Sequence, residues 1–429
     1  MIGAQALARA IGLPSIITFD MGGTTAKASI VENGEVTRAS EYSVGGGMMI
    51  GSRLLNGAGY LLKLPAIDLA EVGAGGGSIV RIDAGGALNV GPDSAGADPG
   101  PVCYDRGGDD PTITDANIVL GYLNPDYLVG GGLALNAEKA RRVFQERIAS
   151  PLDLDLAHAA YGTHEIATSN MIRAIKAVST ERGRDPRQFA LFAFGGNGPI
   201  FAAAMARALK INTIVIPPSP GLFSSFGLLF ADVEHHYSRS YRRLLREADP
   251  SALDAALTEM EASAIRQLAN DGYIGDNAVL RRTAAMHYKG QTFALDIPIP
   301  GGHLTAATLA TLEQAFAEEH LRTYGHRAGP EEPVGLVGLQ VVARGLSNEP
   351  RVPKRMLTAS QSVRSPGGTR RVYFGPDRGW HETRIVGRED LARPLRGPII
   401  VEEYDATCVI PPDASASLDD FGNIRISLS

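Results

Sequence analysis

The feature that most constrains the fold is an uninterrupted apolar segment, Phe189–Phe194. A strand that is apolar on both sides is typical of a parallel sheet covered by helices on both faces. A glycine-rich turn follows it, then an alanine-rich segment that ends near Lys210, and then a second apolar strand at Thr213–Ile216. Strand, helix and strand within about thirty residues form a βαβ unit. The sequence therefore predicts an α/β fold.

Apolar patterning divides the rest of the chain into regions. Residues 45–135 are mostly glycine-rich loops and short strands, with little helical periodicity. Elsewhere, alternation predicts strands and a 3.6-residue period predicts helices. The expected strands are 15–20, 26–31, a strand pair at 284–298, and 334–344, and the expected helices are 157–182, 250–269 and 304–324. We predict a first lobe at 1–240, an α+β region at 241–346, a linker or long loop at 347–370 and a strand-rich C-terminal region at 371–429.

The composition excludes several classes of protein. The chain has 429 residues, with 41 Lys and Arg against 47 Asp and Glu, and a net charge of −6. A nucleic-acid-binding protein usually has a basic excess or a basic stripe, so we expect no nucleic-acid partner. No apolar run reaches the ~18 residues of a membrane span, so we expect no membrane contact. Two cysteines cannot form a disulfide framework, which favours the reducing cytoplasm.

The turn between the first two strands is the first candidate site. Two adjacent glycines allow the backbone to approach a ligand, and their N–H groups can point at one anion. A strand-ending aspartate beside them can hold Mg²⁺ or orient an attacking oxygen. The pattern favours phosphate binding over its alternative, a glycine-rich hairpin with an aspartate cap. The candidates are Asp20 as the catalytic and metal-binding carboxylate and Gly22, Gly23, Thr24 and Thr25 as phosphate donors.

The turn after the buried strand is the second candidate site. It joins that strand to a helix, so the N–H groups of the helix terminus face any ligand there, and the glycines leave room for a flat ring. The spacing is not that of a dinucleotide fingerprint. Tight packing of the strand against the helix is an equally good explanation. The candidate nucleotide-binding residues are Gly195, Gly196, Asn197 and Gly198.

Acidic residues in the glycine-rich region are candidates for a metal site. Carboxylates on loops near a phosphate site can bind a divalent cation. They can equally cap turns and helices, which is the usual role of a loop aspartate. Besides Asp20, the candidate ligands are Asp98 and Asp115.

Taken together, the motifs resemble those of the hydantoinase A/5-oxoprolinase family. They occur in the family's order and spacing along essentially the whole chain. They are Phe19–Thr25, Glu71–Ile79, Ser94–Tyr104, Thr114–Asn117, Phe194–Pro199, Pro220–Gly227, Tyr288–Gln291 and Gly397–Thr407.

The resemblance implies an actin/hexokinase-like (ribonuclease H-like) ATPase lobe with a smaller, strand-rich α+β region. It implies that Asp20–Thr25 is a phosphate loop, that Gly195–Gly198 is an adenosine loop, and that ATP and Mg²⁺ are bound. Family members hydrolyse a cyclic amide, such as a hydantoin or the 5-oxoproline of glutathione metabolism, through a phosphorylated intermediate. Related subunits serve ATP-dependent ketone carboxylases. The implied partner is a hydantoinase B-like subunit or a second copy of the chain.

Three departures from the family pattern bear on the function. The phosphate loop continues as Ala26-Lys27 in place of the usual Thr-Asp, and the usual Asp-Ile-His-Thr is here 68–71 without its histidine. Family members also carry an earlier lobe with its own phosphate loop, whereas this sequence starts in what resembles the interior of a subunit. We therefore expect 1–429 alone to bind ATP weakly and to act within a larger subunit or complex. A ketone carboxylase subunit and a non-catalytic partner-binding lobe are the alternatives.

Overall fold

The computed structural model describes residues 1–39, 42–44, 49–50, 60–62, 66–291, 293–329, 331–347, 352 and 367–428. The chain forms two compact units. Unit 1 comprises 1–181, 185–230 and 352–429, and unit 2 comprises 182–184 and 231–351. Most of the linker expected at 347–370 lies outside the described residues.

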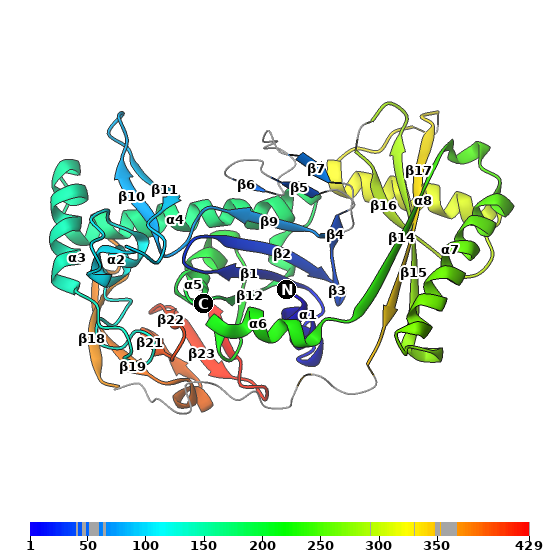
Figure 1. The fold of residues 1–429 in the computed structure, drawn as a ribbon. Coiled ribbons are helices and arrows are strands. Elements are labelled where there is room, and N and C mark those ends of the chain that lie inside the picture. Colours follow the sequence, from blue (N-terminus) through cyan, green and yellow to red (C-terminus); the bar gives the residue numbers. More distant parts are fainter. Residues whose placement is uncertain are drawn as a thin grey trace. The chain divides into compact units, whose positions relative to one another are not determined.

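A ten-stranded mixed sheet is the centre of unit 1 (Figure 1). Its order is β20-β23-β24-β13-β12-β1-β2-β9-β6, and β3 pairs with β2. The middle strands β1, β12 and β13 are parallel, while β2 runs antiparallel to β1 and to β9. The strands are β1 (Ile16–Met21), β2 (Ala26–Glu32), β3 (Glu35–Val36), β6 (Met49–Ile50), β9 (Leu69–Val72), β12 (Ala190–Phe194), β13 (Thr213–Ile216), β20 (Leu395–Arg396), β23 (Ala414–Leu418) and β24 (Ile424–Leu428).

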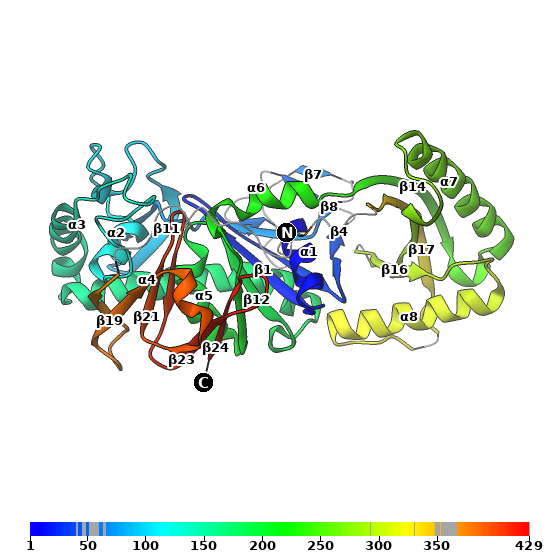
Figure 2. The same ribbon diagram turned by 90° about the horizontal axis from the view of Figure 1, so that it is seen from below.

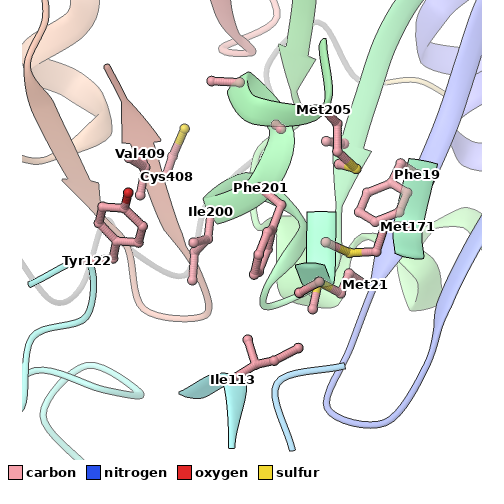
Figure 3. Packing of buried hydrophobic residues seen from close by; sticks show 14 of the residues in the cluster. Phe19, Met21, Ile113, Tyr122, Met171, Ile200, Phe201, Met205, Cys408 and Val409 are labelled. Atoms are coloured by element: carbon pink, nitrogen blue, oxygen red, sulfur yellow. The ribbon is translucent and has the colours of Figure 1, made fainter. Parts of the chain in front are cut away.

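Helices cover both faces of this sheet because its central strands are apolar on both sides. On one face, Phe19 and Met21 of β1 pack with Met171 of α4 (Leu156–Val178) and Phe201 of α5 (Gly198–Leu209), as Figure 3 shows. On the other face lie α1 (Ile2–Ala10) and α6 (Phe223–Gly227). Their side chains pack against the residues of β1 and β12 that point to this face, which include Ile16, Phe192 and Phe194. The prediction of a central, doubly buried strand near 189–194 is confirmed.

The region 45–135, which the sequence predicts to be mostly glycine-rich loops and short strands, also contains a short helix, α2 (Ile113–Val119). It is too short to show a helical period. Its capping box was visible in the sequence: the Thr112 side chain accepts from the backbone of Asp115, and the Asp115 side chain accepts from that of Thr112. The other elements in and beside this region are α3 (Ala137–Phe144), β4 (Arg38–Ala39), β5 (Tyr42–Val44), β7 (Tyr60–Leu62), β8 (Ala66–Ile67), β10 (Ser78–Ile82) and β11 (Leu88–Ser94).

The C-terminal region is built of strands, as expected, and it belongs to unit 1. Strands β23 and β24 extend the main sheet beside β13 (Figure 2). A second sheet of order β18-β19-β21-β22 shares the core of α5. Its strands are β18 (Thr369–Tyr373), β19 (Trp380–Val386), β21 (Ile399–Glu402) and β22 (Thr407–Ile410).

Unit 2 is an antiparallel sheet of order β14-β17-β15-β16 with two helices packed on one face. The unit begins at 231, earlier than the expected boundary at 240, because β14 is one continuous strand across that position. Its elements are β14 (Val233–Leu244), α7 (Pro250–Asn270), β15 (Ala278–Tyr288), β16 (Leu295–Ile299), α8 (Ala306–Tyr324) and β17 (Val334–Gly345). Among the helices that the structure describes, none is both long and apolar enough to span a membrane.

Candidate functional site

The turn between β1 and β2 is open on its outer side. The N–H of Gly22 donates to Thr25 O over 3.1 Å and closes the turn. A Cβ atom placed at Gly22 or Gly23 would meet no other atom within 4 Å, and Gly23 and Thr24 are exposed. The predicted position of this loop between two strands is therefore confirmed.

A second glycine-rich loop, which contains Gly76 and Gly77, is hydrogen-bonded to this turn and sets the direction of its peptide groups. The amides of Gly76 and Gly77 donate to Gly22 O over 3.1 Å and to Gly23 O over 2.7 Å. In a planar trans peptide the C=O and N–H groups point in opposite directions. The N–H groups of Gly23 and Thr24 therefore point away from the loop that contains Gly76 and Gly77. Two successive N–H groups that point the same way form a small anion-binding concavity.

The adenosine-loop candidates lie against the first turn. The backbone N–H of Asn197 donates to Met21 O over 3.0 Å, and its side-chain Nδ2 donates to Gly22 O over 3.1 Å. Gly195 has φ +80°, and a Cβ there would lie 2.4 Å from Met21 O. The structure thus brings together the two glycine-rich loops that the sequence singled out, and α5 begins from them at Gly198.

Asp20 stands at the junction of these loops, on the sheet face that α1 and α6 cover. Its Oδ2 accepts a hydrogen bond from Ser224 Oγ over 2.7 Å. Its Oδ1 lies 2.6 Å from the position that a Cβ of Gly195 would occupy. Lys27 of β2 lies directly opposite Asp20 in the register of β1 and β2. Lys27 Nζ lies 3.7 Å from a carboxylate oxygen of Glu71.

The other predicted metal ligands do not join Asp20 in a cluster. Asp115 is fully buried, and its carboxylate accepts four hydrogen bonds, from the amides of Val102, Cys103 and Thr112 and from Thr112 Oγ1. Burial raises the pKa of this carboxyl, and the hydrogen bonds from Thr112 and Cys103 act to lower it. The oxygens are occupied by the chain's own donors, so Asp115 has a structural role where the sequence suggested a metal ligand.

Asp98 is exposed, and its role as a ligand stays a prediction. Within the described part of the chain, no group of three or more His, Cys, Asp or Glu side chains is arranged to hold a metal ion.

Sequence reasoning assigned no role to two acidic residues near the C-terminus that shape this site. Glu403 forms a buried two-pronged ion pair with Arg388, with both N–O distances 2.7 Å. This pair holds the turn in which Glu403 N donates to Ala406 O. Within that turn, Asp405 Oδ2 accepts from Leu222 N over 3.2 Å, just before α6. The motif 397–407 was the available signal, but a motif alone does not show what its residues touch.

The order of the sheet and the glycine loops at the ends of β1 and β12 define an actin-like ATPase-type lobe. The Hydantoinase/oxoprolinase family model matches residues 1–237, and the model of the family's C-terminal domain matches 243–426. The chain belongs to the hydantoinase/oxoprolinase family, and the predicted resemblance is confirmed.

Individual relatives agree with this assignment. The chain is 40% identical over 414 residues to an uncharacterized protein of Methanocaldococcus jannaschii and 31% identical over 418 residues to the caprolactamase subunit alpha of Pseudomonas jessenii. Each alignment covers 96% of this chain and 58% of the relative, so the chain spans little more than half the relatives' length.

Solved structures give the same result. The crystal structure of the ATP-dependent caprolactamase from Pseudomonas jessenii matches with a TM-score of 0.86 at 30% identity, covering 100% of this chain and 61% of that one. The nucleotide-free structure of an acetone carboxylase matches with a TM-score of 0.71 at 28% identity, covering 100% and 60%.

Proposed function

We propose that this chain supplies an ATP-binding lobe for the ATP-dependent hydrolysis of a cyclic amide. The observation that carries the proposal is the pair of amides at Gly23 and Thr24, which are turned to the open side of the loop because Gly76 and Gly77 hold the carbonyls. The Asp20 carboxylate lies near the end of β1, the strand that leads into this turn. Fixed donors of this kind stabilise phosphate charge without having to reorganise during the reaction.

The proposed reaction has two stages. The amide oxygen attacks the γ-phosphorus of ATP, forming a new P–O bond while ADP leaves. In the second stage, water adds to the activated carbon and the ring C–N bond breaks as nitrogen takes a proton, which leaves an acyl phosphate. A second water hydrolyses the acyl phosphate to phosphate and the open-chain acid. Gly22–Thr25 bind the phosphates, and Gly195–Gly198 pack beside the nucleoside. Positioning and charge neutralisation supply most of the catalysis in such a reaction.

The residues present fit a magnesium ion. Mg²⁺ is typically held by one or two protein carboxylates together with substrate phosphates, and it needs no larger cluster. Asp20 is a hard oxygen ligand beside the phosphate loop, and its Oδ1 accepts no hydrogen bond from the residues that the structure describes. When bound, the ion would neutralise phosphate charge. Asp20 is our proposed ligand, and it also orients the attacking oxygen.

A partner protein is part of the proposal. The relative in Pseudomonas jessenii is named as an alpha subunit, and other relatives are named as carboxylase subunits. We propose a hydantoinase B-like partner that contributes the substrate-side groups. A second copy of this chain is the other arrangement.

Phosphate release tests the function. The chain, mixed with its partner subunit, is assayed with Mg-ATP and caprolactam, hydantoin or 5-oxoproline. We expect release that depends on one of these amides and falls at least ~100-fold in Asp20→Ala, as for loss of a group that acts on the transition state. Release that depends on bicarbonate and a ketone would instead support the carboxylase alternative. No release with either class of substrate would support a non-catalytic lobe.

A further inference from the structure

The start of α6 is fixed in place from three sides. Phe223 is buried, with its ring centroid 5.1 Å from that of Phe194 and 5.7 Å from that of Phe192. Just before it, Pro220 O accepts from Gly195 N over 2.8 Å, and Leu222 N donates to the Asp405 carboxylate. The residue that follows Phe223 is therefore held by packing and backbone contacts that do not involve its own side chain.

That residue, Ser224, points its hydroxyl at the Asp20 carboxylate. The Oγ–Oδ2 distance of 2.7 Å is normal for a hydroxyl that donates to a carboxylate. On the opposite side, Gly195 closes against Oδ1 so tightly that a Cβ would come within 2.6 Å. The Asp20 carboxylate thus lies between the Ser224 hydroxyl, which donates to it, and the backbone of Gly195.

A competing partner lies across the strand pair. Lys27 faces Asp20 in the β1–β2 register, and its ammonium is 3.7 Å from Glu71. Side chains directly opposite in an antiparallel pair have Cβ atoms about 5 Å apart, which is close enough for an ion pair. An Asp20 side chain without another partner can therefore turn towards Lys27 and away from the phosphate loop.

We propose that Ser224 is a positioning residue for Asp20. Its hydroxyl holds the carboxylate in the rotamer that serves bound phosphate, and the clamped start of α6 holds the hydroxyl. The inference rests on the role proposed above for Asp20 and adds a residue to it. It also gives a function to the motif at 220–227, whose sequence alone suggested none.

The test compares two neighbouring serines. Ser224→Ala removes the donor, Ser224→Thr keeps a hydroxyl, and Ser225→Ala is the matched control because Ser225 is exposed on the same helix. We expect Ser224→Ala to lower kcat about 10- to 100-fold, the range for losing a hydrogen bond to a charged group. Ser224→Thr should recover most of that loss, and Ser225→Ala should match the parent chain.

A binding measurement separates positioning from general damage. By calorimetry, Ser224→Ala should weaken ADP binding about tenfold or more in the presence of Mg²⁺, and it should leave ADP binding in EDTA unchanged. The melting temperature should stay close to that of Ser225→Ala. Equal weakening with and without Mg²⁺, or equal behaviour of the two alanine variants, would overturn the inference.

The double variant distinguishes this inference from the proposed function. If Ser224 acts through Asp20, then Asp20→Ala/Ser224→Ala binds Mg-ADP no more weakly than Asp20→Ala alone. An additive loss would show that Ser224 acts separately and would overturn the inference alone. If Asp20→Ala itself changes neither turnover nor Mg-ADP binding, the proposed function of Asp20 fails, and the role of Ser224 fails with it.

Discussion

Gly195 shows how one residue can decide whether the candidate site forms. Its φ of +80° lies in the left-handed region, and the space where a side chain would begin is filled by Met21 O and the Asp20 carboxylate. Only glycine combines that backbone conformation with so close an approach. The glycine therefore allows the adenosine loop to reach the phosphate loop.

Substitution of this glycine should cost more than backbone strain. Gly195→Ala and Gly12→Ala both place a side chain at positive φ, which costs about 1–2 kcal/mol, but a Cβ at Gly12 would meet no atom within 4 Å. We expect Gly195→Ala to lower the free energy of unfolding by a further ~1–3 kcal/mol, the usual cost of overpacking. It should also weaken Mg-ATP binding. Urea unfolding measures the free energy of unfolding, and calorimetry measures Mg-ATP binding. Equal losses of unfolding free energy in Gly195→Ala and Gly12→Ala would show that the contacts around Gly195 do not resist a Cβ atom.

We expect His164 to make the stability of unit 1 depend on pH. It is buried and stacked on Phe201 with ring centroids 4.2 Å apart, and burial lowers its pKa from 6.5 to about 3. Between these values the unfolded chain binds a proton at this residue that the folded chain does not bind. Stability should therefore fall as the pH falls from 6.5 towards 3, by at most ~1.4 kcal/mol per pH unit.

Replacing this histidine tests the sign of the effect. His164→Leu should flatten the plot of unfolding free energy against pH between about 3 and 6.5, whatever its effect on absolute stability. His326→Leu is the control, because His326 is exposed and its side chain forms no ion pair with the residues that the structure describes. An unchanged slope in His164→Leu would show that the imidazole titrates alike in the folded and unfolded states.

At the scale of single elements, buried polar groups fix the short segments that no hydrophobic period specifies. The Asp115 carboxylate joins the start of α2 to the turn at 102–104, and the Arg388–Glu403 pair fixes the turn after β21. A buried ion pair adds little net stability, but loss of one partner leaves an unpaired charge. Such groups therefore specify the local structure more than they stabilise it.

Asp115→Asn separates the structural role from the metal role that the sequence suggested. The amide cannot accept all four hydrogen bonds, and an unsatisfied buried donor costs about 1–3 kcal/mol. We expect the unfolding free energy to fall by that amount, while the Mg²⁺ concentration for half-maximal nucleotide binding stays unchanged. Asp98→Asn, at an exposed position, tests the metal role that stays predicted for Asp98: it should leave the unfolding free energy unchanged and raise that Mg²⁺ concentration. A shift in the Mg²⁺ dependence of Asp115→Asn would show that Asp115 is a metal ligand, and an unchanged dependence in Asp98→Asn would show that Asp98 is not one.

In the molecule as a whole, the segment 231–351, which makes up unit 2 apart from 182–184, is an insertion between two segments of unit 1. Its first strand pairs with its last, so that Val233 lies opposite Gly345 and the chain enters and leaves at adjacent points. Its helices and sheet enclose one hydrophobic cluster, whose buried residues lie within 245–343 and whose partly buried residues begin at Val233. A segment with adjacent ends and its own core has what an independent domain needs.

The excised segment 231–347 should therefore fold by itself. We expect a near-ultraviolet circular dichroism signal and a single cooperative urea transition, because the core is complete within the segment. The complementary protein, in which a short Gly-Ser linker replaces 231–351, should unfold cooperatively as well. A non-cooperative transition in the excised segment would show that its core depends on unit 1.

Elements whose pattern repeats over several residues could be predicted from the amino-acid sequence. The apolar run at 189–194, the helical period before it and the paired glycines after Asp20 correctly predicted a doubly covered sheet with turns at its strand ends. Hydrophobic burial follows a period that can be counted, and a glycine pair restricts the turn that can contain it. The family motifs added the lobe type, which periodicity alone does not distinguish from other α/β folds.

The roles of the polar residues depend on contacts that form in the folded chain. Ser224 and Asp20 are 204 positions apart, and Asp115 meets the amides of 102–103 across a loop. A carboxylate in a sequence can bind a metal, cap a helix or pair with a cation, and the choice depends on which donors the folded chain brings to its oxygens. Those donors lie far away in sequence and follow no period, because hydrogen bonding depends on a few atoms at short range.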